Sequence, residues 1–271
     1  MEALALIDGV THALADARVA VTDDGVARGD GAFETIGVWD GRPFLVDVHL
    51  QRLVRSSLAI GLPAPDVDLL RAEITRLMDV AGSGDDGALR VYVTASGTRI
   101  LTLTPLPPRA SVRHLVPQPA PWIRPLGTYG PAGAKTMSYA PNMAAGRAAR
   151  AAGGDDALLM ALEGLVLEGP TFAVLWTHDG RTLHTPALNL GIVDSISRRV
   201  VVDAARRERL QVQEGHYPLD AVTGAREVLA CSTVRDLMIV ERIGDQTFAA
   251  GDTPVRDRLS AALSDARRGR S

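Results

Sequence analysis

The 29 basic residues of this 271-residue chain comprise 28 arginines and a single lysine, Lys135. An arginine guanidinium stays protonated and is a poor nucleophile, whereas a desolvated lysine amine can lose its proton and attack a carbonyl. Lys135 is therefore the candidate for amine chemistry such as Schiff-base formation. A surface lysine retained by chance would produce the same count, so the neighbouring segments must decide between the two.

Several groups elsewhere in the chain could bind an anion such as a phosphate. They belong to the start of a predicted helix, to a turn after a predicted strand and to one helical arginine, and they are Ser195, Ile196, Ser197, Ser232, Thr233 and Arg52. A helix N-terminus offers free N–H groups, and an arginine adds a cation. Each of them taken alone also fits an ordinary helix cap, turn or surface arginine.

Two further side chains could hold a ring with a basic nitrogen. Glu168 ends the apolar run that begins at Leu165, and a carboxylate there could keep a pyridine nitrogen protonated. Tyr139, four residues after Lys135, could donate a hydrogen bond to a ring oxygen. A carboxylate at a sheet rim and a tyrosine in the core are the plain structural alternatives.

The elements that position these groups are predicted from hydrophobic periodicity and turn residues. Expected strands cover residues 19–21, 33–39, 44–46, 89–94, 100–104, 156–162, 165–168, 172–176 and 227–231. Expected helices cover residues 47–58, 67–80, 142–152 and 195–209, and an amphipathic helix from Val255 is expected to be peripheral, with a frayed basic tail from Ala266.

Composition narrows the class of protein. A net charge of −3 gives no basic field for nucleic acid, and no apolar run reaches membrane-spanning length. The apolar start is broken by Asp8 without a basic leader, and the single Cys231 suits a reducing cytoplasm. We expect a cytoplasmic protein with a small domain over 1–117, a linker over 118–130 and a large domain over 131–271.

In order and spacing, these segments resemble the class IV aminotransferases, the pyridoxal-phosphate enzymes of fold type IV. The resemblance covers about residues 23–248. The segments that carry it are Arg28-Gly29-Asp30-Gly31-Ala32-Phe33-Glu34-Thr35, His49-Leu50-Gln51-Arg52-Leu53, Ala134-Lys135-Thr136-Met137-Ser138-Tyr139-Ala140-Pro141-Asn142, Leu167-Glu168-Gly169, Ser195-Ile196-Ser197-Arg198 and Ser232-Thr233.

The resemblance implies a mixed α/β fold with a small N-terminal α/β domain and a larger C-terminal domain with a β-barrel-like core. It implies pyridoxal phosphate between the domains and a homodimer with shared active sites. Lys135 would be the catalytic residue, holding the cofactor as an internal aldimine and moving a proton in a ping-pong transamination. The implied cofactor-binding residues are Arg52, Tyr139, Glu168, Val193, Ser195, Ile196, Ser197, Ser232 and Thr233.

The substrates would be small amino and keto acids. Arg28 and Arg90 could bind carboxylates, and two arginines suit glutamate or 2-oxoglutarate. We therefore predict a D-amino-acid transaminase with possible side activity on (R)-amines. The other candidate substrate-binding residues are Phe33, Thr35, Tyr92 and Arg99, with Arg90 and Tyr92 on one strand face. Each arginine also fits a surface ion pair.

Other activities remain open at this point. An aminodeoxychorismate lyase would use the same lysine, with Thr35 as a candidate proton donor, and an L-branched-chain aminotransferase comes next. A non-catalytic cofactor carrier is disfavoured because Lys135, Glu168 and Tyr139 occur together. A Schiff-base aldolase would need the strand–helix repeats of a barrel, which the sequence lacks. The chain also departs from the family pattern, with Arg28 at an often aromatic position and Ala173 at a frequent asparagine position.

Overall fold

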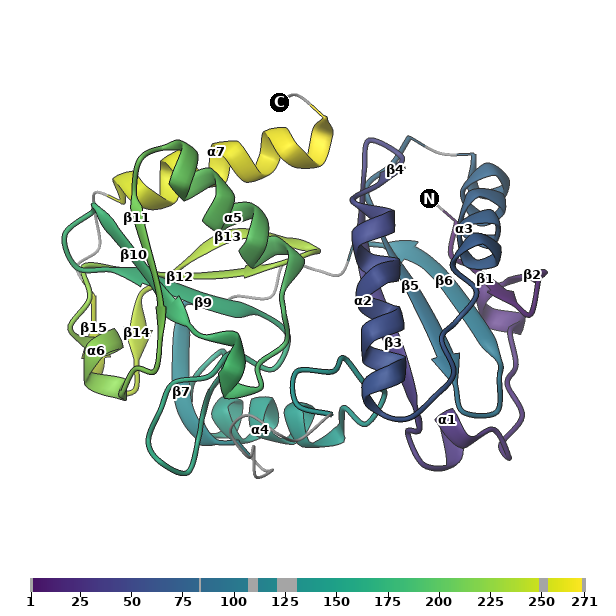
Figure 1. The fold of residues 1–271 in the computed structure, drawn as a ribbon, viewed down its shortest axis with the longest axis horizontal. Coiled ribbons are helices and arrows are strands. Elements are labelled where there is room, and N and C mark those ends of the chain that lie inside the picture. The colour runs from purple at the N-terminus through teal and green to yellow at the C-terminus, as the bar shows by residue number, and fades with distance from the viewer. Residues whose placement is uncertain (1, 83, 107–111, 121–130, 249–252, 270–271) are drawn as a thin grey trace. The chain divides into compact units, whose positions relative to one another are not determined.

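The computed structural model describes residues 2–82, 84–106, 112–120, 131–248 and 253–269. The chain divides into two compact units. Unit 1 contains Met1–Pro108 and Ala134–Tyr139, and unit 2 contains Arg109–Gly133 and Ala140–Ser271. Sheets and helices occur in both units (Figure 1), so the predicted mixed α/β class is confirmed.

Unit 1 is built on a six-stranded sheet of order β2-β1-β6-β5-β3-β4, in which all neighbouring strands run antiparallel. Its strands are β1 (Leu4–Ile7), β2 (Val10–Ala13), β3 (Gly31–Trp39), β4 (Arg42–Pro43), β5 (Gly87–Thr94) and β6 (Arg99–Pro105). Its helices are α1 (Asp24–Ala27), α2 (Val46–Ala59) and α3 (Val67–Ala81), which Figure 1 shows in purple and blue.

One face of this sheet is buried beneath α2 and α3. Side chains alternate along a strand, so most residues of β3, β5 and β6 that point to this face join the apolar core, with Ile36, Leu89 and Leu101 among them. The alternate residues are half-buried on the opposite face: Phe33, Thr35, Arg90, Tyr92, Thr102 and Thr104. This second face therefore carries four of the side chains expected to bind substrate.

A buried carboxylate joins β3 to α2. Arg52 donates to Glu34 from Nε at 2.7 Å and from Nη2 at 2.6 Å, and His49 Nδ1 lies 2.7 Å from the same carboxylate. Burial raises the pKa of Glu34, but the charge of Arg52 and the hydrogen bonds outweigh it and hold that pKa at about 2. Burial lowers the pKa of His49, which favours a neutral imidazole. The sheet and the helix are thus tied together by a charged pair that water does not reach.

Unit 2 contains a five-stranded sheet of order β11-β10-β9-β12-β13 and a four-stranded sheet of order β15-β14-β7-β8. The strands are β7 (His114–Pro119), β8 (Asp156–Met160), β9 (Ala173–Thr177), β10 (Thr182–Pro186), β11 (Gln211–Gly215), β12 (Glu227–Ser232), β13 (Arg235–Val240), β14 (Arg242–Ile243) and β15 (Gln246–Thr247). The helices are α4 (Ala140–Ala151), α5 (Ile196–Arg207), α6 (Leu219–Thr223) and α7 (Pro254–Arg268).

The five-stranded sheet is buried on both faces. Leu175 and Leu229 pack with α5 and α7 on one face, whereas Val174 and Val228 join the core shared with the four-stranded sheet. Because both faces are covered, β9 and β12 read as continuous apolar runs rather than as alternating patterns. Figure 1 shows α5 and α7 together on their side of this sheet.

The division of the chain differs from the expected boundaries. Residues 134–139 associate with unit 1, because they pair with β3, whereas β7 belongs to unit 2, because it pairs with β8. Of the predicted linker, Gln118 and Pro119 lie in β7, and residues 121–130 are outside the described part of the chain.

Four expected elements differ in the structure. Residues 19–21 form no strand, and residues 44–46 form a turn and the first residue of α2 instead of a strand, which is limited to Arg42–Pro43. Residues 165–168 make isolated bridges, and their N–H groups bond to both Leu159 and Tyr217. The C-terminal helix is not peripheral, since α7 buries Val255, Leu259 and Leu263, and its last turn is ordered through Arg267. None of the helices in the described ranges is both long and apolar enough to span a membrane.

Gly31 should be sensitive to substitution. A Cβ atom at this position would lie 2.6 Å from Met137 Sδ and 2.6 Å from the Val93 carbonyl oxygen. Overpacking of this kind costs about 1–3 kcal/mol. We expect Gly31→Ala to lower the free energy of unfolding by that amount in urea titrations, and Gly84→Ala, which meets no atom within 4 Å, to leave it nearly unchanged. A Gly31→Ala protein as stable as the Gly84→Ala control would contradict this packing.

The buried pair predicts how stability depends on pH. The pKa of Glu34 lies below its ordinary value of 4.5, so its contribution is present above that pH and is lost as the pH falls toward about 2. The lowered pKa of His49 adds a loss that begins below its ordinary value of 6.5. Denaturant unfolding from about pH 7 to pH 3 should show Glu34→Gln less stable than wild type by roughly 3 kcal/mol at neutral pH, with a gap that narrows in acid.

The control for this titration is Asp68→Asn, which removes an exposed carboxylate that pairs with Arg71 on the surface. Its difference from wild type should stay small at every pH. If the gap for Glu34→Gln is constant down to about pH 3, the carboxylate does not have the depressed pKa that its surroundings indicate.

Candidate active site

Lys135 is held at the edge of the unit 1 sheet by its backbone. The Lys135 carbonyl accepts from the Phe33 N–H at 3.1 Å, and the Met137 N–H donates to the Gly31 carbonyl at 2.8 Å. On α2, Ser56 Oγ accepts from the Lys135 N–H at 3.0 Å. These bonds place residues 135–137 as a short segment beside the start of β3. The position of the lysine backbone is therefore set by strand pairing rather than by a free loop.

The amine of Lys135 lies among aromatic rings. Its Nζ is 4.0 Å from the centroid of the Phe33 ring and 5.1 Å from that of Tyr139. Phe33 also stacks on Tyr92 at 5.5 Å and meets Tyr139 edge-on at 5.3 Å. Aromatic surfaces keep water from one side of the amine and offer flat faces to a planar ligand.

Arg90 lies on the same sheet face as Phe33. In the register of β3 and β5, Thr35 is opposite Arg90 and Phe33 is opposite Tyr92. Arg90 makes a long contact of 3.4 Å to Thr104 Oγ1 on β6. Burial raises the pKa of Tyr92, although Arg90 acts against the shift, so its phenol stays a hydrogen-bond donor at neutral pH.

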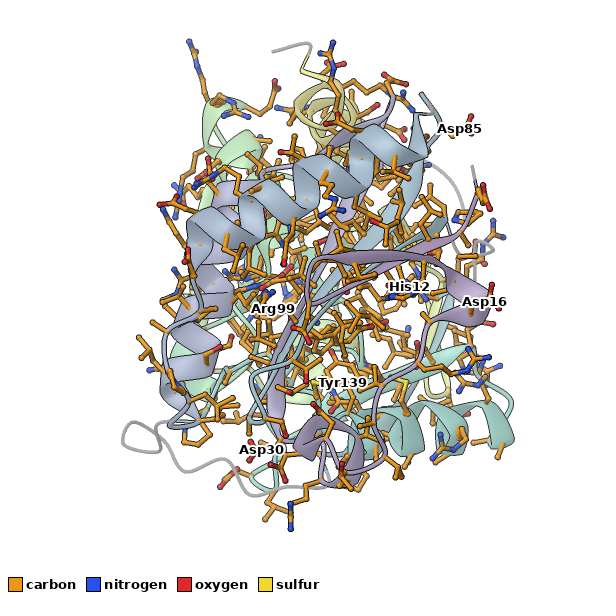
Figure 2. All side chains as sticks on the ribbon, turned by 90° about the vertical axis from the view of Figure 1, so that its right-hand side faces the viewer. His12, Asp16, Asp30, Asp85, Arg99 and Tyr139 are labelled. Carbon is orange, nitrogen blue, oxygen red and sulfur yellow. The ribbon has the colours of Figure 1, made fainter. Side chains whose placement is uncertain are left out.

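The other three arginines of unit 1 that the sequence singled out pair with carboxylates. Arg28 is 71% exposed and binds Asp24 one helical turn away. Arg99, labelled in Figure 2, binds the buried carboxylate of Glu73 at 2.9 Å. Arg52 binds Glu34, as described above. Arg28 and Arg99 thus have the surroundings of structural ion pairs, in contrast to Arg90.

In unit 2, the first turn of α5 has the features of an anion site. Ser195 caps the helix by accepting from the Arg198 N–H at 3.2 Å, which leaves the N–H groups of Ile196 and Ser197 without an intrahelical acceptor. The Ser197 side chain is 1% exposed, and its hydroxyl oxygen has no hydrogen-bond partner in the described part of the chain. A buried hydroxyl costs free energy unless something binds it.

A second unpartnered hydroxyl lies at the end of β12. Ser232 is 9% exposed, and its Oγ has no partner among the described residues. Ser232 pairs with Arg235 on β13, so Thr233 is in the tight turn between the two strands. Of the three serines that the sequence assigned to phosphate, Ser197 and Ser232 therefore share the same unsatisfied state, whereas Ser195 caps α5.

Glu168 lies close to the segment that precedes α5. Its two carboxylate oxygens are 3.3 and 3.2 Å from the Val193 N–H, and the residue is 5% exposed. This contact unites two residues that the sequence assigned to one cofactor but that are 25 positions apart in the chain. A carboxylate held in this way is fixed in orientation and largely removed from water.

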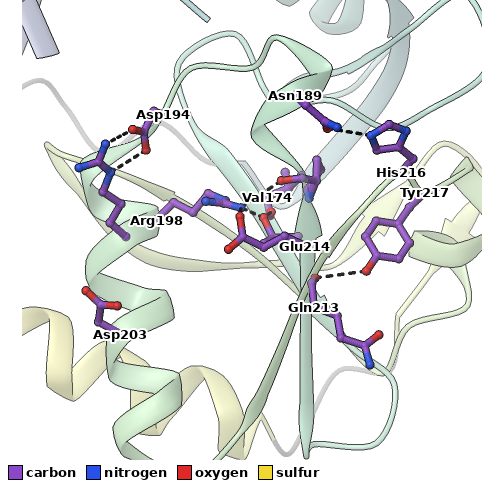
Figure 3. Close-up of polar contacts among 12 residues, drawn as sticks. Val174, Asn189, Asp194, Arg198, Asp203, Gln213, Glu214, His216 and Tyr217 are labelled. Atoms are coloured by element: carbon purple, nitrogen blue, oxygen red, sulfur yellow. Dashed lines mark hydrogen bonds and ion pairs between the residues drawn. The ribbon is translucent and has the colours of Figure 1, made fainter. Parts of the chain in front are cut away.

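Arg198 anchors the start of α5 to the five-stranded sheet. Its guanidinium binds Thr185 Oγ1 at 3.0 Å, the Pro186 carbonyl at 3.1 Å and Glu214 at 2.6 Å. Figure 3 shows this contact with Glu214 and the ion pair that joins Asp194 to α5. The helix N-terminus is thereby locked in place.

The residues present fit pyridoxal phosphate on chemical grounds. Unit 1 offers a half-buried lysine amine between aromatic rings, and unit 2 offers two unsatisfied hydroxyls, a helix N-terminus and a buried carboxylate. An aldehyde, a phosphate and a pyridine nitrogen require these three kinds of partner.

Sequence reasoning missed three residues that shape these groups: Ser56, Arg198 in its anchoring role, and Arg267. Ser56 stands one helical turn after Arg52, and Arg267 continues the four-residue spacing of Leu259 and Leu263. This helical spacing was the only signal in the sequence that these side chains lie on the same helix faces as Arg52, Leu259 and Leu263. It does not identify their partners, which come from distant segments.

Comparison with known proteins identifies the family. The model described as amino-transferase class IV matches residues 31–243. The bifunctional aminodeoxychorismate lyase / D-amino acid transaminase of Mycobacterium tuberculosis is 35% identical over 58% of this chain and 60% of its own length. The aminodeoxychorismate lyase of Bacillus subtilis is 27% identical, with 87% of this chain and 85% of that protein covered.

Solved structures agree with this family. A fold IV transaminase from Curtobacterium pusillum has a TM-score of 0.89 at 26% identity, covering 99% of both chains. A hypothetical aminotransferase from Mycobacterium tuberculosis in its PLP-bound form has the same TM-score and identity and covers 99% of this chain and 100% of its own. The predicted fold type, enzyme class and cofactor are confirmed. Because the matched range takes in Lys135, Glu168 and both serine turns, the chain belongs to the class IV aminotransferases and depends on pyridoxal phosphate for its activity.

Proposed function

We propose that this aminotransferase moves an amino group between a D-amino acid and a 2-oxo acid such as 2-oxoglutarate. The observation that carries the proposal is the place of Arg90. Its guanidinium lies on the half-buried sheet face that also bears Phe33, the ring nearest the Lys135 amine. A cation on that face suits a substrate with a second carboxylate. Relatives named D-alanine aminotransferase, such as that of Bacillus licheniformis at 24% identity, agree with it.

We assign the cofactor contacts by chemistry. Lys135 would bind the aldehyde carbon, Tyr139 the ring oxygen and Glu168, oriented by Val193, the ring nitrogen. Phosphate contacts would come from Arg52 and from the two turns with unsatisfied hydroxyls, whose residues are Ser195, Ile196, Ser197, Ser232 and Thr233. When bound, pyridoxal phosphate supplies an electron sink for the carbon that carries the amino group.

The side chains of this chain then have distinct tasks. The Lys135 amine would act as the acid and base that moves the proton at the substrate carbon. Phe33 and Tyr139 limit the access of water to that amine. Glu168 keeps its partner nitrogen protonated because a fixed, buried carboxylate favours the charged form of a nearby base.

A second activity, aminodeoxychorismate lyase, is favoured by Thr35. Its hydroxyl-bearing side chain lies on the Arg90 face, where it could donate a proton to a leaving enolate. Two of the relatives named above carry that activity in their names. An L-branched-chain aminotransferase ranks third, because a charged Arg90 fits an aliphatic side chain poorly, although a putative enzyme of that kind from Methanocaldococcus jannaschii is 30% identical.

The homodimer with shared sites and the cytoplasmic location stay predictions. A dimer would be seen as a doubled mass in light scattering of the purified enzyme.

Amino-donor specificity is the direct test of the activity. Purified enzyme would be mixed separately with D-glutamate, D-alanine, L-leucine and (R)-1-phenylethylamine, and the loss of the yellow lysine-bound cofactor absorbance followed. We expect the D-amino acids to bleach it fastest. Rapid bleaching by L-leucine alone would reject the proposal, and pyruvate release from aminodeoxychorismate without amino transfer would favour the lyase.

Lys135→Arg should abolish both turnover and the yellow absorbance, because a guanidinium cannot form a Schiff base with the cofactor aldehyde.

Arg90→Gln tests the carboxylate site. Loss of a charge-assisted hydrogen bond of about 1.5–3 kcal/mol should raise KM for 2-oxoglutarate about 10- to 100-fold. KM for pyruvate, which lacks the second carboxylate, should change much less. Arg28→Gln is the matched control, because Arg28 is exposed and already paired with Asp24. An equal rise in KM for both oxo acids would show that Arg90 does not recognise the second carboxylate of the substrate.

A further inference from the structure

The last turn of α7 reaches the tight turn between β12 and β13. The Arg267 residue is 5% exposed, although it lies only four positions from the end of the chain. Its Nη2 donates to three backbone carbonyls, those of Ser232 at 2.8 Å, Thr233 at 3.3 Å and Arg235 at 2.6 Å. Its Nη1 is 3.1 Å from Asp236. One guanidinium thus binds most of the hairpin turn.

Because peptide groups are planar, these contacts also fix the direction of the N–H groups of the turn. In a planar trans peptide the carbonyl oxygen and the N–H that follows it point in opposite directions. With the Ser232 and Thr233 carbonyls directed at Arg267, the N–H groups of Thr233 and Val234 are directed away from it. Successive N–H groups presented in this way are a common cradle for anions.

The local charges favour an anion near the end of β12. Burial raises the pKa of Cys231, next to Ser232, to about 12, and the charges of Arg267 and Arg198 act against that shift. Both guanidinium groups are thus within electrostatic reach of the end of β12. Arg198 is itself anchored at the start of α5, next to the unpartnered Ser197 hydroxyl. Burial lowers the pKa of Arg267 to about 10, which leaves it charged at neutral pH.

We propose that Arg267 is a positioning residue for the cofactor phosphate, holding the Ser232–Thr233 turn so that its N–H groups and the Ser232 hydroxyl face the phosphate. The inference rests on the assignment of this turn to phosphate in the proposed function. It does not depend on which amino acid is the substrate. The C-terminal helix, remote in sequence from every residue of the family motifs, thereby controls how tightly the phosphorylated cofactor is retained.

A purely structural role for Arg267 predicts a different outcome. If the guanidinium only joins α7 to the hairpin, its loss weakens folding and affects every ligand equally. If it orients the phosphate turn, its loss weakens binding of pyridoxal phosphate and leaves binding of pyridoxal, which has the same ring and aldehyde without the phosphate, close to wild type. The ratio of the two dissociation constants therefore separates the two roles.

The experiment titrates the full-length chain, freed of cofactor, with pyridoxal phosphate and with pyridoxal, following the yellow absorbance at Lys135. Arg267→Met should weaken pyridoxal phosphate about 10- to 100-fold, the value of a charged hydrogen bond, and pyridoxal less than about threefold. Arg258→Met is the matched control, because Arg258 joins the same helix to Glu208 without touching the turn. Both of its affinities should match wild type.

Arg267→Lys covers the case in which the methionine variant fails to fold. It keeps the charge and the buried stem, but its one ammonium nitrogen replaces the two guanidinium nitrogens that bind Asp236 and the carbonyls of the turn. The preference for pyridoxal phosphate over pyridoxal should still fall by at least about threefold, since part of the bonding is lost. An unchanged preference in this variant, or equal losses for both ligands in either variant, overturns the proposal. Because no substrate is used, a wrong substrate assignment leaves the result unaffected.

Discussion

The backbone pairing between β3 and residues 135–137 determines where the reactive amine of this enzyme lies. A lysine side chain has four rotatable carbon bonds, so a lysine on a free loop would spread its amine over a wide volume. Here the Lys135 carbonyl, the Lys135 N–H and the Met137 N–H are all bonded within unit 1. The aromatic rings of Phe33 and Tyr139 then confine the side chain itself.

That pairing gives β3 a double task. Its helix-facing residues include Glu34, whose carboxylate fixes Arg52 and His49 in the interior. Its other residues, Phe33 and Thr35, face the side of the sheet where Arg90 and Tyr92 lie. Alternation along one strand thus places Glu34 in the interior of unit 1 and Phe33 and Thr35 on the face proposed to bind substrate. On the helix-facing side, the bidentate pair with Arg52 offsets the cost of burying the Glu34 charge. The residues of the opposite face take no part in this pair and can stay polar.

Much of this arrangement could be predicted from the sequence, since it depends on local patterns. β3, α3 and α5 were predicted to within a few residues, because periodicity and Ser or Asp caps mark them clearly. The shared face of Arg90 and Tyr92 followed from strand alternation alone. The family motifs were recognisable because they combine residue types in a required order.

Other features depend on contacts between distant segments, and no local pattern carries them. Arg28, Arg90 and Arg99 look alike in sequence, yet Asp24 and Glu73 bind two of them. Residues 134–139 were expected in the large domain because a proline-rich stretch precedes them, whereas their hydrogen bonds are made to β3. The basic residues from Ala266 were expected to fray, but residues 266–268 continue α7 and Arg267 is buried.

The scarcity of reactive side chains has a practical consequence for handling this enzyme. Its one cysteine is fully buried with a raised pKa, and its one lysine is half-buried among aromatic rings. Thiol-directed dyes therefore find no side-chain handle on the folded protein, and amine-directed coupling to a resin or fluorophore has a choice between the N-terminus and Lys135, the residue proposed to hold the cofactor. With Lys135 in its proposed role, immobilisation through side-chain amines would inactivate the enzyme in proportion to the coupling achieved.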